Sequence, residues 1–107
     1  MSISIIVFSK ENYEWKDFPL GSFSSLYSQI NEKILEKYPV FNNLLQKIDS
    51  EDDSSITGDD ISNLNKEFTE LLHNTNPLLN STYQLSFKKY LDFIKDKNFH
   101  TWQVTIK

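Results

Sequence analysis

SISIIVFS, at residues 2–9, is the stretch on which the fold depends. Its apolar residues are mostly β-branched, and in an extended chain they fall on both faces. A short apolar run of this kind predicts a strand that is buried on both faces of a sheet. Ile3, Ile5 and Val7 would lie on one face, and Ile6 and Phe8 on the other.

The residues that follow predict a partner for this strand. Residues 10–12 have the polar character of a turn, and Tyr13 and Trp15 then alternate with charged residues over 13–16. Such alternation is typical of a half-exposed strand, so the first two strands would form a hairpin. We expect Pro19 to end the second strand.

A second strand pattern lies at the other end of the sequence. Over residues 101–107, Trp102, Val104 and Ile106 alternate with polar residues. The apolar residues between the two terminal strands have helical spacing instead. We therefore expect the terminal strands to lie side by side, in either orientation, with the helices over one face of the sheet.

Four helices are predicted from this spacing. Ser22 is a suitable N-cap for the first, Pro39 stops it, and Ser86 would cap the last. The expected helices cover 22–38, 41–48, about 58–73 and 87–97, and Leu78, Leu79 and Leu85 would pin a loop over 77–85 to the core. The prediction is one α+β domain over residues 1–107, or a small α/β one, with a three-stranded sheet covered by about four helices.

The composition fits a single small domain of 107 residues with an aromatic core. There are no cysteines, which is typical of a reducing compartment. The N-terminal residues lack the pattern of a signal peptide, and no segment is apolar for long enough to cross a membrane. We expect a cytoplasmic protein with no membrane partner.

The acidic residues are concentrated in DSEDDSSITGDD, at residues 49–60. Six of these residues are carboxylates, whereas the formal charge of the whole chain is −4, so the remainder is basic by two charges. All eleven basic residues are lysine. Because arginine supplies bidentate contacts to phosphates and bases, its absence argues against a nucleic-acid partner. A macromolecular partner is expected to be basic.

One interpretation of residues 49–60 is a calcium-binding loop. Oxygen-bearing side chains occupy the EF-hand ligand positions at Asp49, Glu51, Asp53, Ser55, Thr57 and Asp60. Two departures count against this interpretation, because Ser54 replaces the usual glycine and Asp60 replaces a longer Glu. The alternative is a solvated loop whose end begins a helix, where carboxylates are favoured.

No catalytic arrangement is apparent. His73 and His100 fall on different predicted elements without a carboxylate at ligand spacing, and there is no phosphate-binding loop or serine elbow. A carboxylate cluster in water repels itself and does not provide a buried general acid. We therefore predict that the protein is not an enzyme and has no catalytic residue, metal or cofactor.

Protein binding is the function class that remains. Carboxylates gathered on one loop would attract a basic partner and raise its association rate. Tyr13 and Trp15 are candidate anchors, since aromatic rings are enriched in binding hot spots, and core packing is the alternative for both. The predicted acidic part of the interface is Glu51, Asp52, Asp53, Asp59 and Asp60.

Several features follow one another in an order that resembles a known family. A short strand precedes Trp15 and a Gly-Ser-Phe helix start at 21–23, Tyr-Pro at 38–39 leads into a short helix, and an Asp-rich loop opens a helix over 57–60. The chain then ends in a strand with an aromatic residue. This order is similar to that of immunity protein family 70, from bacterial polymorphic-toxin and contact-dependent growth-inhibition systems.

The resemblance implies a non-enzymatic cytoplasmic inhibitor that forms a 1:1 heterodimer with the toxic domain of a cognate effector. Many such toxins are nucleases, which are basic because they bind nucleic acid. The expected partner is a ribonuclease whose nucleic-acid-binding or active-site surface is covered by the carboxylates of the inhibitor. The alternatives are a single-loop calcium-binding module at residues 49–60 and a small structural adaptor.

Overall fold

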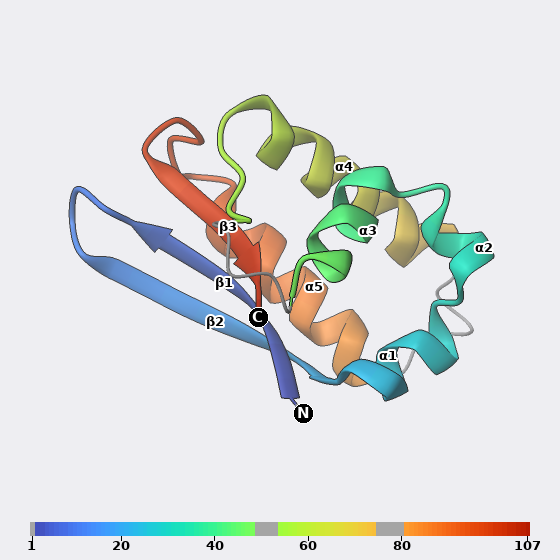
Figure 1. The fold of residues 1–107 in the computed structure, drawn as a ribbon. Coiled ribbons are helices and arrows are strands. Elements are labelled where there is room, and N and C mark those ends of the chain that lie inside the picture. The colour runs from blue at the N-terminus through green and yellow to red at the C-terminus, as the bar shows by residue number, and fades with distance from the viewer. Residues whose placement is uncertain (1, 49–53, 75–80) are drawn as a thin grey trace.

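The computed structural model describes residues 2–48, 54–74 and 81–107, which form a three-stranded sheet and five helices (Figure 1). The central strand is β1 (Ser2–Ser9), flanked by β2 (Glu14–Ser22) and β3 (Trp102–Ile106). Both pairings are antiparallel. The fold is therefore α+β with adjacent N- and C-terminal strands, as predicted, and the orientation that the sequence left open is antiparallel.

β2 continues through Pro19 to Ser22, so the prediction that Pro19 ends this strand is wrong. β2 is an edge strand, and Pro19 lies opposite Ser4 of β1. An edge strand tolerates proline where the nitrogen faces away from the sheet, because no ladder hydrogen bond is lost there. The pairing skips Leu20, which is the extra residue of a β-bulge.

The first predicted helix is divided into two. α1 (Phe23–Gln29) begins after Ser22, whose Oγ accepts the Ser25 N–H at 3.1 Å, as expected of an N-cap. α2 (Glu32–Leu35) begins after Asn31, whose Oδ1 accepts the Ile34 N–H at 3.1 Å. The Asn31 side chain thus caps a new helix, and a residue that can do so favours a break in the preceding one.

α3 (Pro39–Gln46) follows directly, with Pro39 at the start of the helix, where a missing N–H costs little. α4 (Asp59–Asn74) agrees with the third predicted helix. The predicted helices therefore correspond to five in the described residues, because the first is interrupted.

α5 (Ser81–Ile94) begins earlier than the sequence suggested, so the loop assignment is wrong from residue 81 onward. Ser86 lies inside this helix instead of capping it, and its hydroxyl donates to the Pro19 carbonyl, which ties α5 to β2. Leu85 is 53% exposed and does not contribute to the core. The predictions for Leu78 and Leu79 fall outside the described residues.

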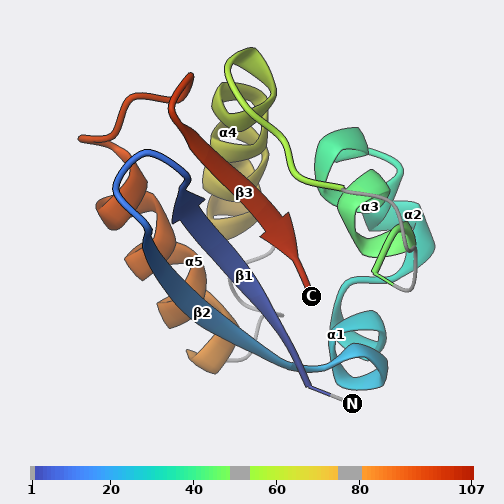
Figure 2. The same ribbon diagram turned by 60° about the vertical axis from the view of Figure 1, so that its left-hand side comes forward.

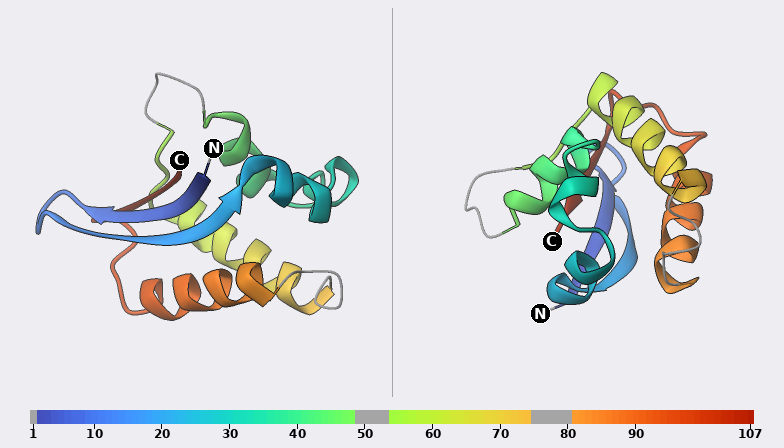
Figure 3. Two further views of the ribbon diagram at one scale, coloured as in Figure 1. Left: turned by 90° about the horizontal axis from the view of Figure 1, so that it is seen from below. Right: turned by 90° about the vertical axis from the view of Figure 1, so that its right-hand side faces the viewer.

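β1 is buried on one face only, so the prediction of burial on both faces is wrong. Ile3, Ile5 and Val7 are at most 1% exposed, whereas Ile6 and Phe8 are only partly buried. α4 and α5 lie on the side of the first face (Figure 3). No helix of the described ranges lies over the second face at the hairpin end. An antiparallel sheet, unlike a parallel one, commonly has one face in solvent.

The core between the sheet and the helices is largely aromatic. The Phe68 ring of α4 meets those of Phe41, Phe87 and Tyr90 at centroid distances of 5.0, 4.7 and 5.4 Å. Phe18 of β2 meets Tyr90 edge to face at 5.9 Å. The rings thus join β2, α3, α4 and α5, and each such pair adds about 0.5–1.5 kcal/mol to the effect of burial.

A buried carboxylate joins α4 to α3. Glu67 is 9% exposed, and its two oxygens accept the backbone N–H groups of Val40 and Phe41 at 3.1 and 2.9 Å. These amides lie in the first turn of α3, where no intrahelical acceptor is available. Burial raises the pKa of Glu67 above its ordinary value, and the two N–H bonds oppose that rise.

Three of the helices lie away from the hairpin end of the sheet. α1, α2 and α3 gather at the end opposite the β1–β2 hairpin (Figures 1 and 2). The outer edge of β3 is covered by Ile56, which exchanges backbone hydrogen bonds of 2.8 and 3.1 Å with Val104. Within the described residues, no helix is long and apolar enough to cross a membrane.

Candidate protein-binding surface

The β1–β2 hairpin carries two exposed aromatic side chains. Tyr13 is 91% exposed and Trp15 is 69% exposed. The eight Phe, five Tyr and two Trp of the chain all lie in the described residues, and the others are buried or partly buried. Large apolar side chains that are grouped in solvent mark interaction sites. The two predicted anchors are therefore the two aromatic residues that are exposed to solvent.

Local hydrogen bonds hold the hairpin turn in place. Ser9 pairs with Glu14 and is 2% exposed, and its Oγ accepts the Asn12 N–H at 3.3 Å. Tyr13 then has a φ of 55°, in the left-handed region. This conformation costs an L-residue about 1–2 kcal/mol, and glycine or asparagine adopts it more readily. The turn therefore explains neither the presence of a tyrosine nor its exposure.

Phe8, on the central strand β1, is the cross-strand neighbour of Trp15. The two residues are directly opposite in the register, so their side chains share one face of the sheet. The sequence analysis does not predict Phe8 as a binding residue, because it predicts that both faces of this strand are buried. We call Phe8, Tyr13 and Trp15 the hairpin aromatic surface. A shallow depression of about 450 Å³ there is lined by Phe8, Ser9, Lys10, Tyr13, Glu14 and Trp15.

The structure describes two of the five predicted acidic residues. Glu51, Asp52 and Asp53 lie outside the described residues, so their part in an interface stays a prediction. Asp59 and Asp60 are exposed in the first turn of α4. Their position has a local explanation, since the helix dipole stabilises negative charge there.

The described acidic residues and the hairpin aromatic surface do not form one cluster. The Gly58 amide donates to the Phe99 carbonyl at 2.7 Å, and Trp102 pairs with Ser9. The segment 99–102 therefore lies between the start of α4 and the hairpin.

Only some of the proposed calcium ligands can be placed, because Asp49, Glu51 and Asp53 lie outside the described residues. Ser54 is 7% exposed, and its Oγ is hydrogen-bonded to the Thr105 Oγ1 at 3.1 Å. No three acidic or histidine side chains in 2–48, 54–74 and 81–107 are grouped so that they could hold a metal ion.

Two buried polar side chains have structural partners. Glu67 binds the amides of α3, and the Tyr90 hydroxyl donates to the Asn65 Oδ1 at 2.7 Å. Burial raises the pKa of the Tyr90 phenol well above its ordinary value, because it disfavours the charged form. Both groups are explained by folding. His73 and His100 are exposed on separate elements, one in α4 and one in the turn before β3.

Comparison of the chain with models of protein families, with curated proteins and with solved structures gives no match.

Proposed function

We propose that this protein is a non-enzymatic immunity protein that binds and neutralises a cognate bacterial toxin domain, with the hairpin aromatic surface as its anchor. The observation that carries the binding part is the exposure of Tyr13 and Trp15 on a paired, two-stranded scaffold. An aromatic side chain buries a large area on binding while it loses the freedom of only two torsion angles. Residues of this type dominate binding energy in protein interfaces.

The class of partner rests on charge and on the family resemblance. The carboxylates of residues 49–60 would steer a basic surface toward the inhibitor, and a nuclease has such a surface where it binds nucleic acid. The inhibitor would act in the cytoplasm and form a 1:1 complex, with Glu51, Asp52, Asp53, Asp59 and Asp60 near the rim of the interface. Tyr13 and Trp15 would supply most of the affinity, and the carboxylates most of the association rate.

Neutralisation can be tested with the toxin domain that the neighbouring reading frame is expected to encode. The domain is expressed from an inducible promoter in a bacterial host, with or without this protein. We expect growth arrest by the toxin alone and growth when the two are expressed together. A neighbouring gene without a toxic domain, or growth arrest that persists on co-expression, would show that the proposed function is wrong.

The role of charge has a separate test. A variant with Asp52, Asp53, Asp59 and Asp60 changed to Asn should associate more slowly with the toxin domain, and its association rate should depend less on salt. The matched control changes Glu32 and Glu36, exposed at the other end of the molecule, to Gln. Equal association rates for the parent and the Asn variant at low salt would remove these carboxylates from the interface.

A further inference from the structure

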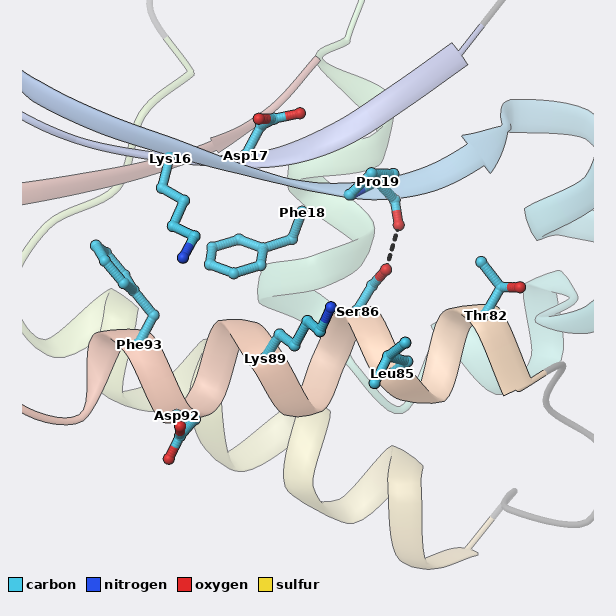
Figure 4. A pocket seen from close by; sticks show the side chains of 10 residues that line it. All are labelled: Lys16, Asp17, Phe18, Pro19, Thr82, Leu85, Ser86, Lys89, Asp92 and Phe93. Carbon is cyan, nitrogen blue, oxygen red and sulfur yellow. Dashed lines mark hydrogen bonds between the residues drawn. The ribbon is translucent and has the colours of Figure 1, made fainter.

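A groove separates the edge strand β2 from the helix α5 that runs beside it (Figure 4). It has a volume of about 560 Å³, and β2 and α5 supply all of its lining. The Ser86 hydroxyl closes one part of it by donating to the Pro19 carbonyl. The groove lies below the sheet, whereas the hairpin aromatic surface lies on the opposite face.

The register shows which backbone groups of β2 point into this space. The N–H and C=O of Ser4 bind Lys107 at 2.7 and 3.1 Å, so they face β3. Backbone groups alternate between the two sides of a strand, and those of Ile5 and Val7 therefore face β2. Their partners in the register, Phe18 and Lys16, face β1 in return.

The neighbours of Lys16 and Phe18 consequently face outward. The N–H and C=O groups of Trp15 and Asp17 point away from β1, and so does the carbonyl of Pro19. The bond from Ser86 to that carbonyl agrees with this direction. In the part of the chain that the structure describes, no strand pairs with this edge of β2.

The side chains of the groove favour an acidic occupant. The Lys16 ammonium lies 5.8 and 5.4 Å from the ring centroids of Phe18 and Phe93, and Lys89 projects from α5 toward the same space (Figure 4). Asp92 is already paired with Lys95 at 2.8 Å. The carboxylate of Asp17 points away from α5 (Figure 4). Two lysines are therefore left to face a ligand.

Apolar surface is also available beside these lysines. Leu85 is 53% exposed on α5, and Phe93 is partly exposed at the other end of the groove. An edge strand with a helix alongside it can accept an extended peptide, whose backbone bonds to the edge while its side chains enter the groove.

We infer that the β2–α5 groove binds an extended, acidic segment of a partner protein, which adds a fourth strand to the sheet at Trp15 and Asp17. Acidic side chains of the segment face Lys16 and Lys89, and an apolar one packs on Leu85 or Phe93. Pro19 limits the added strand to a few residues, because it lacks an N–H and its carbonyl is bound to Ser86. The groove and the hairpin aromatic surface lie on opposite faces of the sheet and share only the Trp15 backbone, so the inference does not depend on the proposed function.

The probe is a fluorescent, terminally blocked heptapeptide with glutamate at positions 3 and 5, valine at positions 1 and 7, and threonine at positions 2, 4 and 6, because alternate side chains of a strand share one face. The control peptide has lysine in place of glutamate. Binding is followed by fluorescence anisotropy at peptide concentrations up to about 1 mM, where weak complexes are still populated. We expect the glutamate peptide to bind at least about tenfold more tightly than the lysine peptide, and the reverse preference when Lys16 and Lys89 are both changed to Glu.

A backbone variant tests strand addition itself. Asp17→Pro removes an outward N–H and leaves the bonds to β1 in place, as the natural Pro19 does two residues away. Asp17→Ala is the matched control, since it removes the same side chain and keeps the N–H. We expect about fivefold to tenfold weaker binding for the proline variant than for the alanine variant, with equal melting temperatures.

Three results would overturn the inference. These are no binding of the glutamate peptide at about 1 mM, equal binding of the two peptides, and equal affinity of the two Asp17 variants. A fourth contradicting result would come from analytical ultracentrifugation. A dimer that Asp17→Pro abolishes would identify a second copy of this chain as the occupant of the groove. Toxin neutralisation by the Asp17 variants is measured in parallel, so that failure here is distinguished from failure of the proposed function.

Discussion

At the scale of single residues, Tyr13 is the clearest case of a side chain that folding does not require. It is almost fully exposed and has a left-handed backbone. Tyr13→Asn should therefore leave the free energy of unfolding unchanged or raise it by about 0.5–1 kcal/mol, because asparagine adopts this conformation more readily. Denaturant unfolding measures the change. A loss of stability would mean that the tyrosine ring supports the fold and is not reserved for a partner.

For Glu67 we expect the opposite result, because its carboxylate stabilises the fold. Glu67→Ala leaves the Val40 and Phe41 amides without their acceptor, so it should lower the free energy of unfolding by about 1–3 kcal/mol. Glu67→Gln should cost less because it keeps one acceptor. Lys66→Gln, exposed on the same helix, is the control and should stay within about 0.5 kcal/mol of the parent.

The raised pKa of Glu67 also predicts a pH dependence. The folded protein holds this proton more tightly than the unfolded chain, so the contribution of Glu67 to stability falls as pH rises from the ordinary value of 4.5 to the raised folded pKa. The free energy of unfolding of the parent, relative to Glu67→Gln, should fall across that window and then become constant. A relative rise would contradict the dominance of burial.

At the scale of secondary-structure elements, side-chain caps determine where the short helices begin. Ser22→Ala and Asn31→Ala should each lower the free energy of unfolding by about 1 kcal/mol, because each removes the acceptor for an amide of the first turn. Ser24→Ala, exposed within α1, should change it by less than about 0.5 kcal/mol. Thermal unfolding of the three variants compares them, and equal melting temperatures would rule out a capping role.

The sequence predicts most elements correctly because their apolar periodicity is strong, and its errors occur at particular residues. Asn31 interrupts an otherwise helical pattern by capping α2, which periodicity alone does not reveal. Pro19 suggests a strand end, but it lies on an edge where its nitrogen faces outward. Ser86 suggests a helix start, but it is a buried hydroxyl inside α5 whose partner is distant in sequence. The outcomes at Pro19 and Ser86 depend on tertiary contacts, whereas the break at Asn31 depends on a local hydrogen bond.

At the scale of the whole molecule, the arrangement of the helices determines which side chains remain available for binding. The alternation in residues 2–9 predicts that the strand has two apolar faces, but it does not show that the helices cover only one of them. Phe8 lies on the uncovered face and is therefore partly exposed. Tyr13 and Trp15 are predictable as candidates from their type and position. Their exposure follows only once α4 and α5 are placed beneath the sheet and α1–α3 at its far end.

The central claim is that the hairpin aromatic surface anchors a toxin domain, and the affinity of a double variant tests it most directly. Tyr13 and Trp15 are changed to Ser, and the dissociation constant for the toxin domain is measured by calorimetry beside Glu36→Ser with Gln46→Ser at the opposite end. We predict at least about 30-fold weaker binding for the hairpin variant, an unchanged melting temperature, and parent-like affinity for the control. A hairpin variant that binds as tightly as the parent would contradict the claim.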